Sequence, residues 1–154
     1  MMVPAMKVHM ERTFYGEANV VVILGGTNDL IRHVPGTTIG AGVVEIHEAA
    51  KRLMRERGQE GHTVAITIPD THEAHHDKER RVANKVIRHY ASANAESTLL
   101  FDMEDIWPLD RDGFRDLWSP DGMHYSEIGY ARMGYELYKM LKIHLMAAKK
   151  LLEA

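Results

Sequence analysis

The sequence contains no cysteine among its 154 residues. Disulfide bonds, thiolate nucleophiles and cysteine-based zinc sites are therefore excluded. It also contains no apolar run approaching the roughly 18 residues that a membrane-spanning helix needs, so we expect no membrane partner. The first residues lack the features of a secretory signal, because Lys7 and Arg12 interrupt their apolar side chains. The default expectation is a cytoplasmic protein.

An excess of charge of one sign is absent as well. The 19 basic residues are interleaved with 22 acidic ones, and the formal net charge is −3. Such a chain offers no basic stripe to a polyanion, so we expect no nucleic-acid partner. The nucleotide-phosphate motifs G-x-G-x-x-G and G-x-x-x-x-G-K-[ST] are also missing, which argues against a nucleotide cofactor.

The composition is that of an ordinary globular protein, with 45% apolar and 27% charged residues. A chain of this length buries roughly two thirds of its unfolded surface and can form one core. We therefore predict a single domain over residues 1–154.

Short apolar runs alternate along the chain with segments of helical periodicity. The apolar runs predict strands at 20–24, 62–68 and 97–102, and the periodic segments predict helices at 2–13, 43–57, 77–92 and 126–148. Residues 104–120 are predicted to form an ordered loop with one helical turn. Strands that alternate with helices are typical of a parallel α/β sheet with right-handed crossovers. We therefore predict an α/β fold.

Polar side chains gather where these strands end. Residues 28–29 follow the first strand, Asp70 follows the second and Asp102 follows the third. Ligands of open parallel sheets bind beyond the carboxyl ends of the strands. The loop at 119–126 comes after the last strand, so it is expected to reach the same edge.

Asp121 and His124 stand three residues apart in that loop. This spacing lets the carboxylate accept the Nδ1 hydrogen of the imidazole, which leaves Nε2 as a base. It equally suits a structural role, in which Asp121 makes an Asx-type turn with Gly122 and His124 packs near the start of the helix. Taken alone, the pattern favours the structural role.

Asn28 follows a buried strand through Gly25 and Gly26, which allow a close approach of the backbone. A side-chain amide at this place can donate a hydrogen bond to a developing oxyanion. Two other interpretations stay open, because Gly-Thr-Asn-Asp is also ordinary turn chemistry and glycine-rich amides can cradle a phosphate. The lack of a following lysine weighs against the phosphate.

The segment HEAHH at 72–76 formally satisfies H-E-x-x-H. In a helix, His72 and His76 would share one face with the spacing of a metal-binding pair. The segment directly follows Pro69-Asp70 and has no apolar stripe that would bury it, so we predict a solvated loop and no metal site. A metal-dependent hydrolase that uses this cluster is kept as the second alternative function.

Taken together, "GGTND" at 25–29 and "DGMH" at 121–124 resemble two sequence blocks of the SGNH hydrolases, the GDSL-type esterases and lipases. Residues 26–29 match the G-x-N-D block of that family, and residues 121–124 match its D-x-x-H block. The resemblance extends over residues 17–141. Two blocks at matched positions are far more specific than either block alone.

The resemblance implies a three-layer α/β/α sandwich with a flavodoxin-like parallel sheet. It also implies hydrolysis of an ester, thioester or acyl-sugar bond without a metal or another cofactor. In that chemistry His124 would be the general base, Asp121 its orienting partner and Asn28 an oxyanion donor. The expected partner is a small-molecule ester or acylated substrate. The substrate-binding loop would contain Gly26, Thr27 and Asp29.

One block of that family has no match here. Its members carry the nucleophilic serine in a G-D-S block at the end of their first strand, and no such block precedes Val20. We therefore expect an N-terminally shortened form without its nucleophile, and a catalytically inactive binding or interaction protein of the same fold is the first alternative. Structural roles suit the serines that are present, including a helix cap for the last of them. These serines are Ser92, Ser97, Ser119 and Ser126.

The missing first strand would lie beside Val20–Leu24 in the sheet of that family. Its loss would leave this strand with a bare apolar edge, and bare edges pair with other chains. We expect either a shortened form of a longer parent or a homodimer that joins two sheets across this edge.

Overall fold

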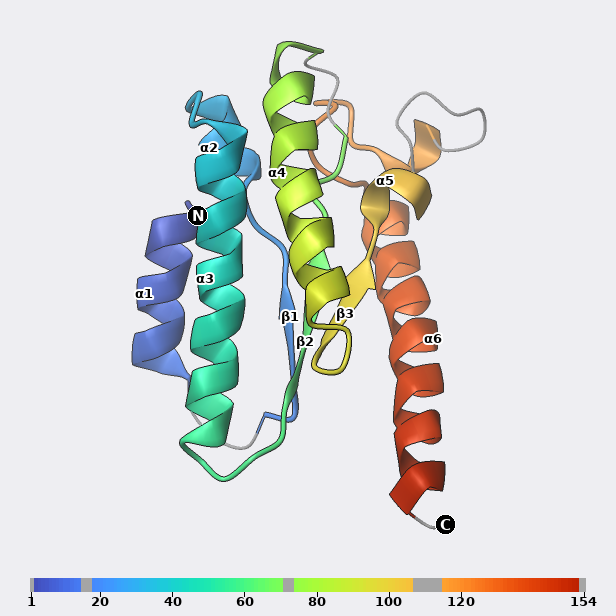
Figure 1. Cartoon of the computed structure of the whole chain (residues 1–154). Coiled ribbons are helices and arrows are strands. Elements are labelled where there is room, and N and C mark those ends of the chain that lie inside the picture. Colours follow the sequence, from blue (N-terminus) through green and yellow to red (C-terminus); the bar gives the residue numbers. More distant parts are fainter. Residues whose placement is uncertain (1, 15–17, 71–73, 107–114, 153–154) are drawn as a thin grey trace. The chain divides into compact units, whose positions relative to one another are not determined.

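The computed structural model describes residues 2–14, 18–70, 74–106 and 115–152 (Figure 1). The chain divides into two compact units, Met1–Pro108 and Leu109–Ala154. The first unit contains the sheet and the helices that cover it, and the second contains the long C-terminal helix.

Three parallel strands form the sheet of the first unit. They are β1 (Val20–Ile23), β2 (His62–Ile66) and β3 (Thr98–Phe101), in that order across the sheet. The register places Val22 opposite Val64, and Val64 opposite Leu99. Parallel neighbours need a long crossover connection, and here both crossovers contain helices. The predicted α/β fold with a parallel sheet flanked by helices is confirmed.

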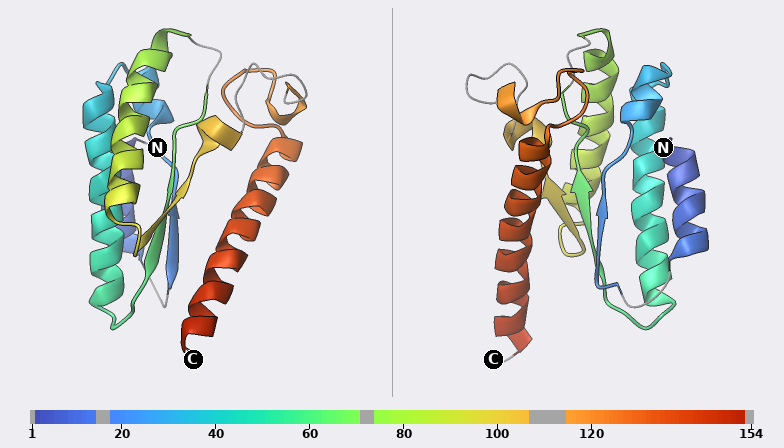
Figure 2. Two further views of the ribbon diagram at one scale, coloured as in Figure 1. Left: turned by 45° about the vertical axis from the view of Figure 1, so that its right-hand side comes forward. Right: turned by 180° about the vertical axis from the view of Figure 1, so that it is seen from behind.

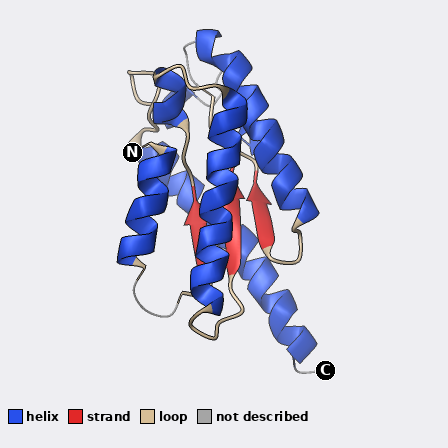
Figure 3. Cartoon of the chain, turned by 60° about the vertical axis from the view of Figure 1, so that its left-hand side comes forward, coloured by secondary structure: helices blue, strands red, loops and turns tan. Residues whose placement is uncertain are grey.

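Helices α3 and α4 lie side by side against one face of this sheet (Figure 3). Two glycines allow their close approach. A Cβ on Gly36 would lie 2.1 Å from the carbonyl oxygen of Glu79, and one on Gly40 would lie 2.7 Å from the Cβ of Val86. The helices of this unit are α1 (Val3–Thr13), α2 (Thr27–Ile31), α3 (Gly36–Arg55), α4 (Ala74–Ala93) and α5 (Met103–Ile106).

The core lies between the sheet and these helices. Burial of its aliphatic side chains supplies the main stabilising free energy of the unit, at about 25 cal/mol per Å² of apolar surface. Its members are Val3, Ile23, Leu30, Ile39, Val43, Ile46, Ala50, Ala65, Ile68, Ala83, Ile87 and Ala91.

The second unit contains a 3₁₀ turn, η1 (Arg115–Leu117), and the helix α6 (Glu127–Leu152). Ser126 caps α6 as predicted, because its Oγ accepts a hydrogen bond from the N–H of Gly129 at 3.1 Å. Within the described ranges, no helix combines the length and the apolar character that crossing a bilayer would take.

Two segments near the predicted site are helical although no helix was predicted there. Helix α2 forms in place of a turn, since the N–H groups of Asp29 and Leu30 both donate to the carbonyl oxygen of Gly26. Helix α3 begins at Gly36 and not at residue 43. Its threonines and glycines hide the helical pattern, yet Ile39 is buried and continues the apolar face toward the N-terminus.

The predicted solvated loop at 72–76 is wrong for its last residues. Helix α4 begins at Ala74, so His75 and His76 are helical, and His76 is buried. Arg80 explains the earlier start, because its guanidinium pairs with Asp77 in the first turn and with Asp70 just before the helix. His72 and Glu73 lie outside the described residues.

Candidate active site

Gly26 shapes the loop at the carboxyl end of β1. Its φ of 112° lies in the left-handed region that favours glycine. A Cβ at this position would also lie 2.6 Å from Cδ1 of Ile68 and 2.8 Å from Cγ2 of Ile39. The chain turns here into α2 and places Asn28, an exposed residue, on the first turn of that helix.

Asp29 holds this loop against α1. It is only 2% exposed, and its Oδ2 accepts a hydrogen bond from the N–H of Val3 at 3.0 Å. That N–H belongs to the first turn of α1, where intrahelical acceptors are lacking and a carboxylate is favourable. The carboxylate is thus engaged in structure, whereas Thr27 and Asn28 line open space.

That open space is a cavity of about 470 Å³. At one end it is lined by Thr27 and Asn28, and from there it follows β1. Met6 and Met10 of α1, together with Ile46 of α3, form its apolar wall. Its size and lining suit a small ligand or a polypeptide segment.

The predicted edge carboxylates Asp70 and Asp102 are held in an ionic network. Arg80 is 1% exposed and pairs with Asp70 at 2.8 Å and with Glu104 at 3.1 Å. Arg88 binds Asp102 at 2.5 Å. Burial alone would raise the pKa of Asp102, but hydrogen bonds from Arg88 and Thr67 lower it overall. These carboxylates therefore stabilise the edge of the sheet.

The two arginines of this network were not predicted from the sequence. Arg80 and Arg88 are eight residues apart on α4. Because charged side chains on a helix usually face water, this spacing alone does not predict that either arginine is buried. Their partners follow other strands, and only the fold brings them together.

In the second unit, Asp121 and His124 form a closed pair. Oδ2 of Asp121 lies 2.8 Å from Nδ1 of His124. Oδ1 accepts hydrogen bonds from the N–H groups of Met123 and His124, both at 2.9 Å. The N–H of His124, its ring and the N–H of Met123 together lower the pKa of Asp121 to about 2. Both roles considered for the pair are present at once, because one oxygen shapes the turn and the other orients the imidazole.

A small bridged structure supports this pair. The N–H of Ser119 donates to the carbonyl oxygen of His124 at 2.8 Å, and Trp118 and Tyr125 form an antiparallel bridge. The rings of Trp118 and Tyr125 pack with centroids 4.5 Å apart. Gly129 is needed beside them, since a Cβ there would lie 2.1 Å from the carbonyl oxygen of Leu117. The backbone of His124 is thereby fixed at the start of α6.

A metal site finds no support in the described ranges. No group of three or more His, Cys, Asp or Glu side chains there is arranged to hold an ion. His75 and His76 instead pack with His33, whose ring centroid lies 6.1 Å and 5.6 Å from theirs.

The family model of the GDSL-like lipases and acylhydrolases matches residues 5–132, which include most of the first unit, the first part of the second unit and all the predicted site residues. The chain belongs to this family. No curated protein matches this sequence.

Two solved structures share the fold. One, from Streptococcus pneumonia and provisionally described as a platelet activating factor, is 18% identical with a TM-score of 0.74 over 92% of this chain and 68% of that chain. The other is a crystal structure that is 23% identical, with a TM-score of 0.60 over 86% of this chain and 68% of its own. At these identities the likeness establishes the fold alone.

Proposed function

We propose that this chain hydrolyses carboxylic or acyl esters, with His124 as the general base. The observation that carries the proposal is the hydrogen bond of 2.8 Å between Asp121 and Nδ1 of His124. Because the pKa of Asp121 is lowered to about 2, its carboxylate is ionised at neutral pH and favours the tautomer with hydrogen on Nδ1. Nε2 is then the nitrogen that can accept a proton.

Asn28 would serve as the oxyanion donor. It is exposed on the first turn of α2, and the rigid turn at Gly26 holds it at the carboxyl end of β1. A side-chain N–H carried on this turn can donate to the negative charge that develops on the carbonyl oxygen of an ester. Asn28 belongs to the first unit and the Asp121–His124 pair to the second.

The nucleophile in this proposal is water. Ser126, the serine nearest to His124 in the sequence, donates its hydroxyl hydrogen to the carbonyl oxygen of Asp116 at 2.6 Å and caps α6. In the reaction, Nε2 of His124 takes a proton from water while the water oxygen bonds to the ester carbonyl carbon. Collapse of the oxyanion breaks the bond to the alcohol oxygen, which receives the proton back from Nε2.

The rate should be low, because a serine and its acyl-enzyme step take no part. Sites from which one member of a triad was removed retain roughly 10³ to 10⁴ over uncatalysed hydrolysis. We expect at most such a rate.

The test is hydrolysis of 4-nitrophenyl acetate by the chain and by an Asn28→Ala variant. Loss of the oxyanion donor should lower kcat by about 10²-fold or more, with little change in KM. Asn94→Ala is the control, because its amide caps a turn at the end of α4. If Asn28→Ala and Asn94→Ala hydrolyse equally fast, the role of Asn28 is refuted. Covalent labelling of the chain by a fluorophosphonate would show that the nucleophile is a serine and not water.

A further inference from the structure

One edge of β1 carries polar backbone groups that pair with no strand of the described residues. The N–H of His62 donates to the carbonyl oxygen of Asn19 at 2.8 Å, so Asn19, Val21 and Ile23 direct their backbone groups at β2. Successive residues of a strand alternate in direction. Val20 and Val22 therefore direct their N–H and C=O groups away from β2, and no strand of the described ranges borders them there.

An apolar wall stands over this same edge. Helix α1 packs beside α3 and lies beyond β1, on the side away from β2 (Figure 3). Met6 and Met10, one helical turn apart on α1, line the cavity along the edge together with Ile46 of α3. The edge and the wall together form a slot, open where a further strand would run.

The outward-facing backbone groups of β1 determine which kind of ligand fits the slot. An acyl chain or another apolar ligand would cover the backbone N–H and C=O groups of Val22 without bonding to them, which costs free energy for each group. An extended polypeptide satisfies them with its own ladder, and its side chains on the helix side would contact the two methionines. The slot therefore fits a β-strand better than a small ligand.

A second copy of this chain fits the slot less well. Two identical β1 edges can pair antiparallel only about a two-fold axis perpendicular to the sheet. Such an axis keeps α1 and α3 of both copies on the same face. Because α1 projects beyond β1 in that layer, it would occupy the space needed by α3 of the other copy (Figure 3).

We propose that the β1 edge binds an extended strand of a different polypeptide, one with apolar side chains at alternate positions. The bound strand extends the sheet beside β1 and passes under Met6 and Met10. One end of it lies next to Thr27 and Asn28, which line the same cavity. The proposal does not depend on ester hydrolysis, and its test uses no substrate.

The probe is a fluorescent, lysine-flanked peptide of alternating valine and threonine, and the readout is fluorescence anisotropy with the full chain. A second peptide is N-methylated at every other amide and cannot form a ladder on that edge. Binding of the first peptide, at least tenfold tighter than that of the second, is expected. Equal binding of both peptides would mean non-specific adhesion and would overturn the proposal.

Val22→Pro is the decisive variant. It removes a donor that points into the slot and leaves the hydrogen bonds to β2 intact. Leu100→Pro is the matched control, because Leu100 is exposed and its backbone groups point away from β2 on the opposite edge of the sheet. We expect Val22→Pro to weaken peptide binding at least tenfold and Leu100→Pro to leave it unchanged. Equal loss in both variants, or in neither, would contradict the proposal.

A second slot variant and sedimentation of the chain test the proposal independently of Val22→Pro. Should Val22→Pro fail to fold by circular dichroism, Met10→Glu places a charge in the wall of the slot and is expected to weaken binding as well. Sedimentation of the chain alone should show a monomer. A dimer that the slot variants dissociate would assign this edge to a second copy and overturn the choice of partner.

Discussion

Arg80 and its sequence neighbour Arg81 both pair with Asp77, yet the Arg80 side chain is 1% exposed and that of Arg81 is 68% exposed. Arg80 also binds Asp70 and Glu104, so it neutralises carboxylates that follow β2 and β3. Two arginine–aspartate pairs that share Asp77 thus differ in environment, because the Arg80 side chain is buried and the Arg81 side chain is in water.

Replacing Arg80 should therefore cost far more stability than replacing Arg81. Arg80→Met removes the arginine that binds the partly buried Asp70, while Asp77 keeps Arg81 and Glu104 keeps Arg88. Because Arg80 itself is 1% exposed, we expect the variant to lower the free energy of unfolding by about 3 kcal/mol. Arg81→Met removes only an exposed pair and should cost about 1 kcal/mol or less. Urea denaturation of both variants measures the difference. Similar costs would show that the network does not stabilise the sheet edge.

Gly26→Ala should destabilise the loop that carries Asn28. The new Cβ would meet Ile68 and Ile39 at less than 3 Å and would stand at a φ of 112°, for which we expect a cost of about 2–4 kcal/mol. Gly58→Ala is the control, since its φ is 73° but no atom lies within 4 Å of the added Cβ. It should cost about 1–2 kcal/mol from backbone strain alone. Thermal unfolding of the two variants measures both stability losses. Equal losses would show that contacts of the new Cβ with Ile68 and Ile39 do not contribute.

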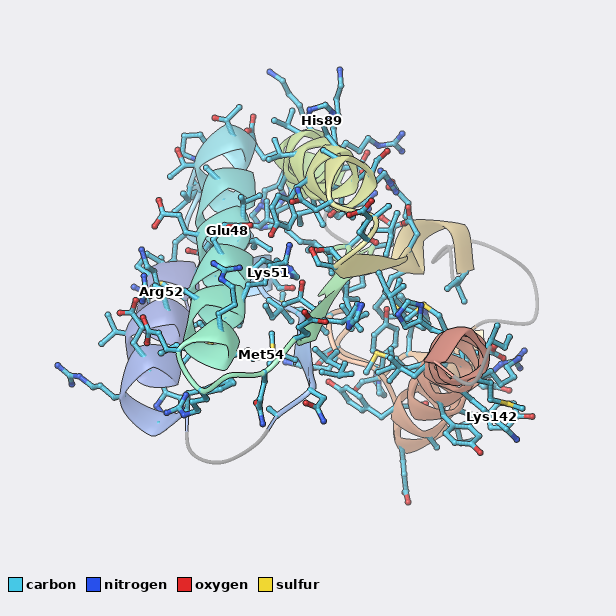
Figure 4. The ribbon with its side chains drawn as sticks, turned by 60° about the horizontal axis from the view of Figure 1, so that its bottom comes forward. Glu48, Lys51, Arg52, Met54, His89 and Lys142 are labelled. Carbon is cyan, nitrogen blue, oxygen red and sulfur yellow. The ribbon has the colours of Figure 1, made fainter. Side chains whose placement is uncertain are left out.

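His47 should make the protein less stable in mild acid. It is 0% exposed, neither ring nitrogen has a hydrogen-bond partner among the described residues, and Tyr90 packs against it. Burial, with a further effect of Lys51, lowers the pKa of His47 from 6.5 to about 4. Figure 4 shows Lys51 on α3, and its ammonium lies 5.0 Å from the centre of the Tyr90 ring that packs against His47. The next residue, Arg52, points toward α1, where it pairs with Glu11.

The sign follows from proton binding. Between pH 6.5 and 4 the unfolded chain binds a proton at His47 that the folded chain does not, so stability falls as the pH falls. The full effect is about 3 kcal/mol, reached near pH 4. In His47→Leu this part of the pH dependence should disappear from urea denaturation curves. An unchanged slope in the variant would show that His47 has the same pKa in the folded and the unfolded chain.

The pKa of Asp121 should stay low even without the imidazole. The largest cause of its value of about 2 is the backbone N–H of His124, which a His124→Ala variant retains. The ring contributes second, so the variant should show a pKa between 2 and the ordinary 3.8. Carboxyl NMR titration measures this value. A pKa of 3.8 in the variant would mean that the turn collapses without the ring.

Strands and polar motifs were predictable because their signals are local. The three predicted strands agree with the structure within two residues at each end, since short apolar runs between turn residues have few other uses. The spacing of Asp121 and His124 allowed both a contact and a turn, and the structure contains both. Helix starts were less accurate, because the first turn of α3 depends on packing of Gly36 and Gly40 against α4.

Long-range electrostatics could not be predicted. Arg80 meets Glu104 only after β3 has paired with β2, and nothing in the local sequence marks either residue as buried. The same holds for Asp29, whose bond to the N–H of Val3 requires α1 to pack against α3. Residues that match a short motif are visible in a sequence, whereas the residues that hold them in place are visible only in the fold.

The most direct test of the proposed function is the initial rate of 4-nitrophenyl acetate hydrolysis by the chain, by His124→Ala and by His89→Ala. His89 is exposed on α4 and points away from the rest of the first unit (Figure 4), so its variant corrects for hydrolysis by any surface imidazole. The account predicts that the rate falls to background in His124→Ala and is retained in His89→Ala. Equal rates in all three proteins would show that the Asp121–His124 pair performs no hydrolysis in this chain.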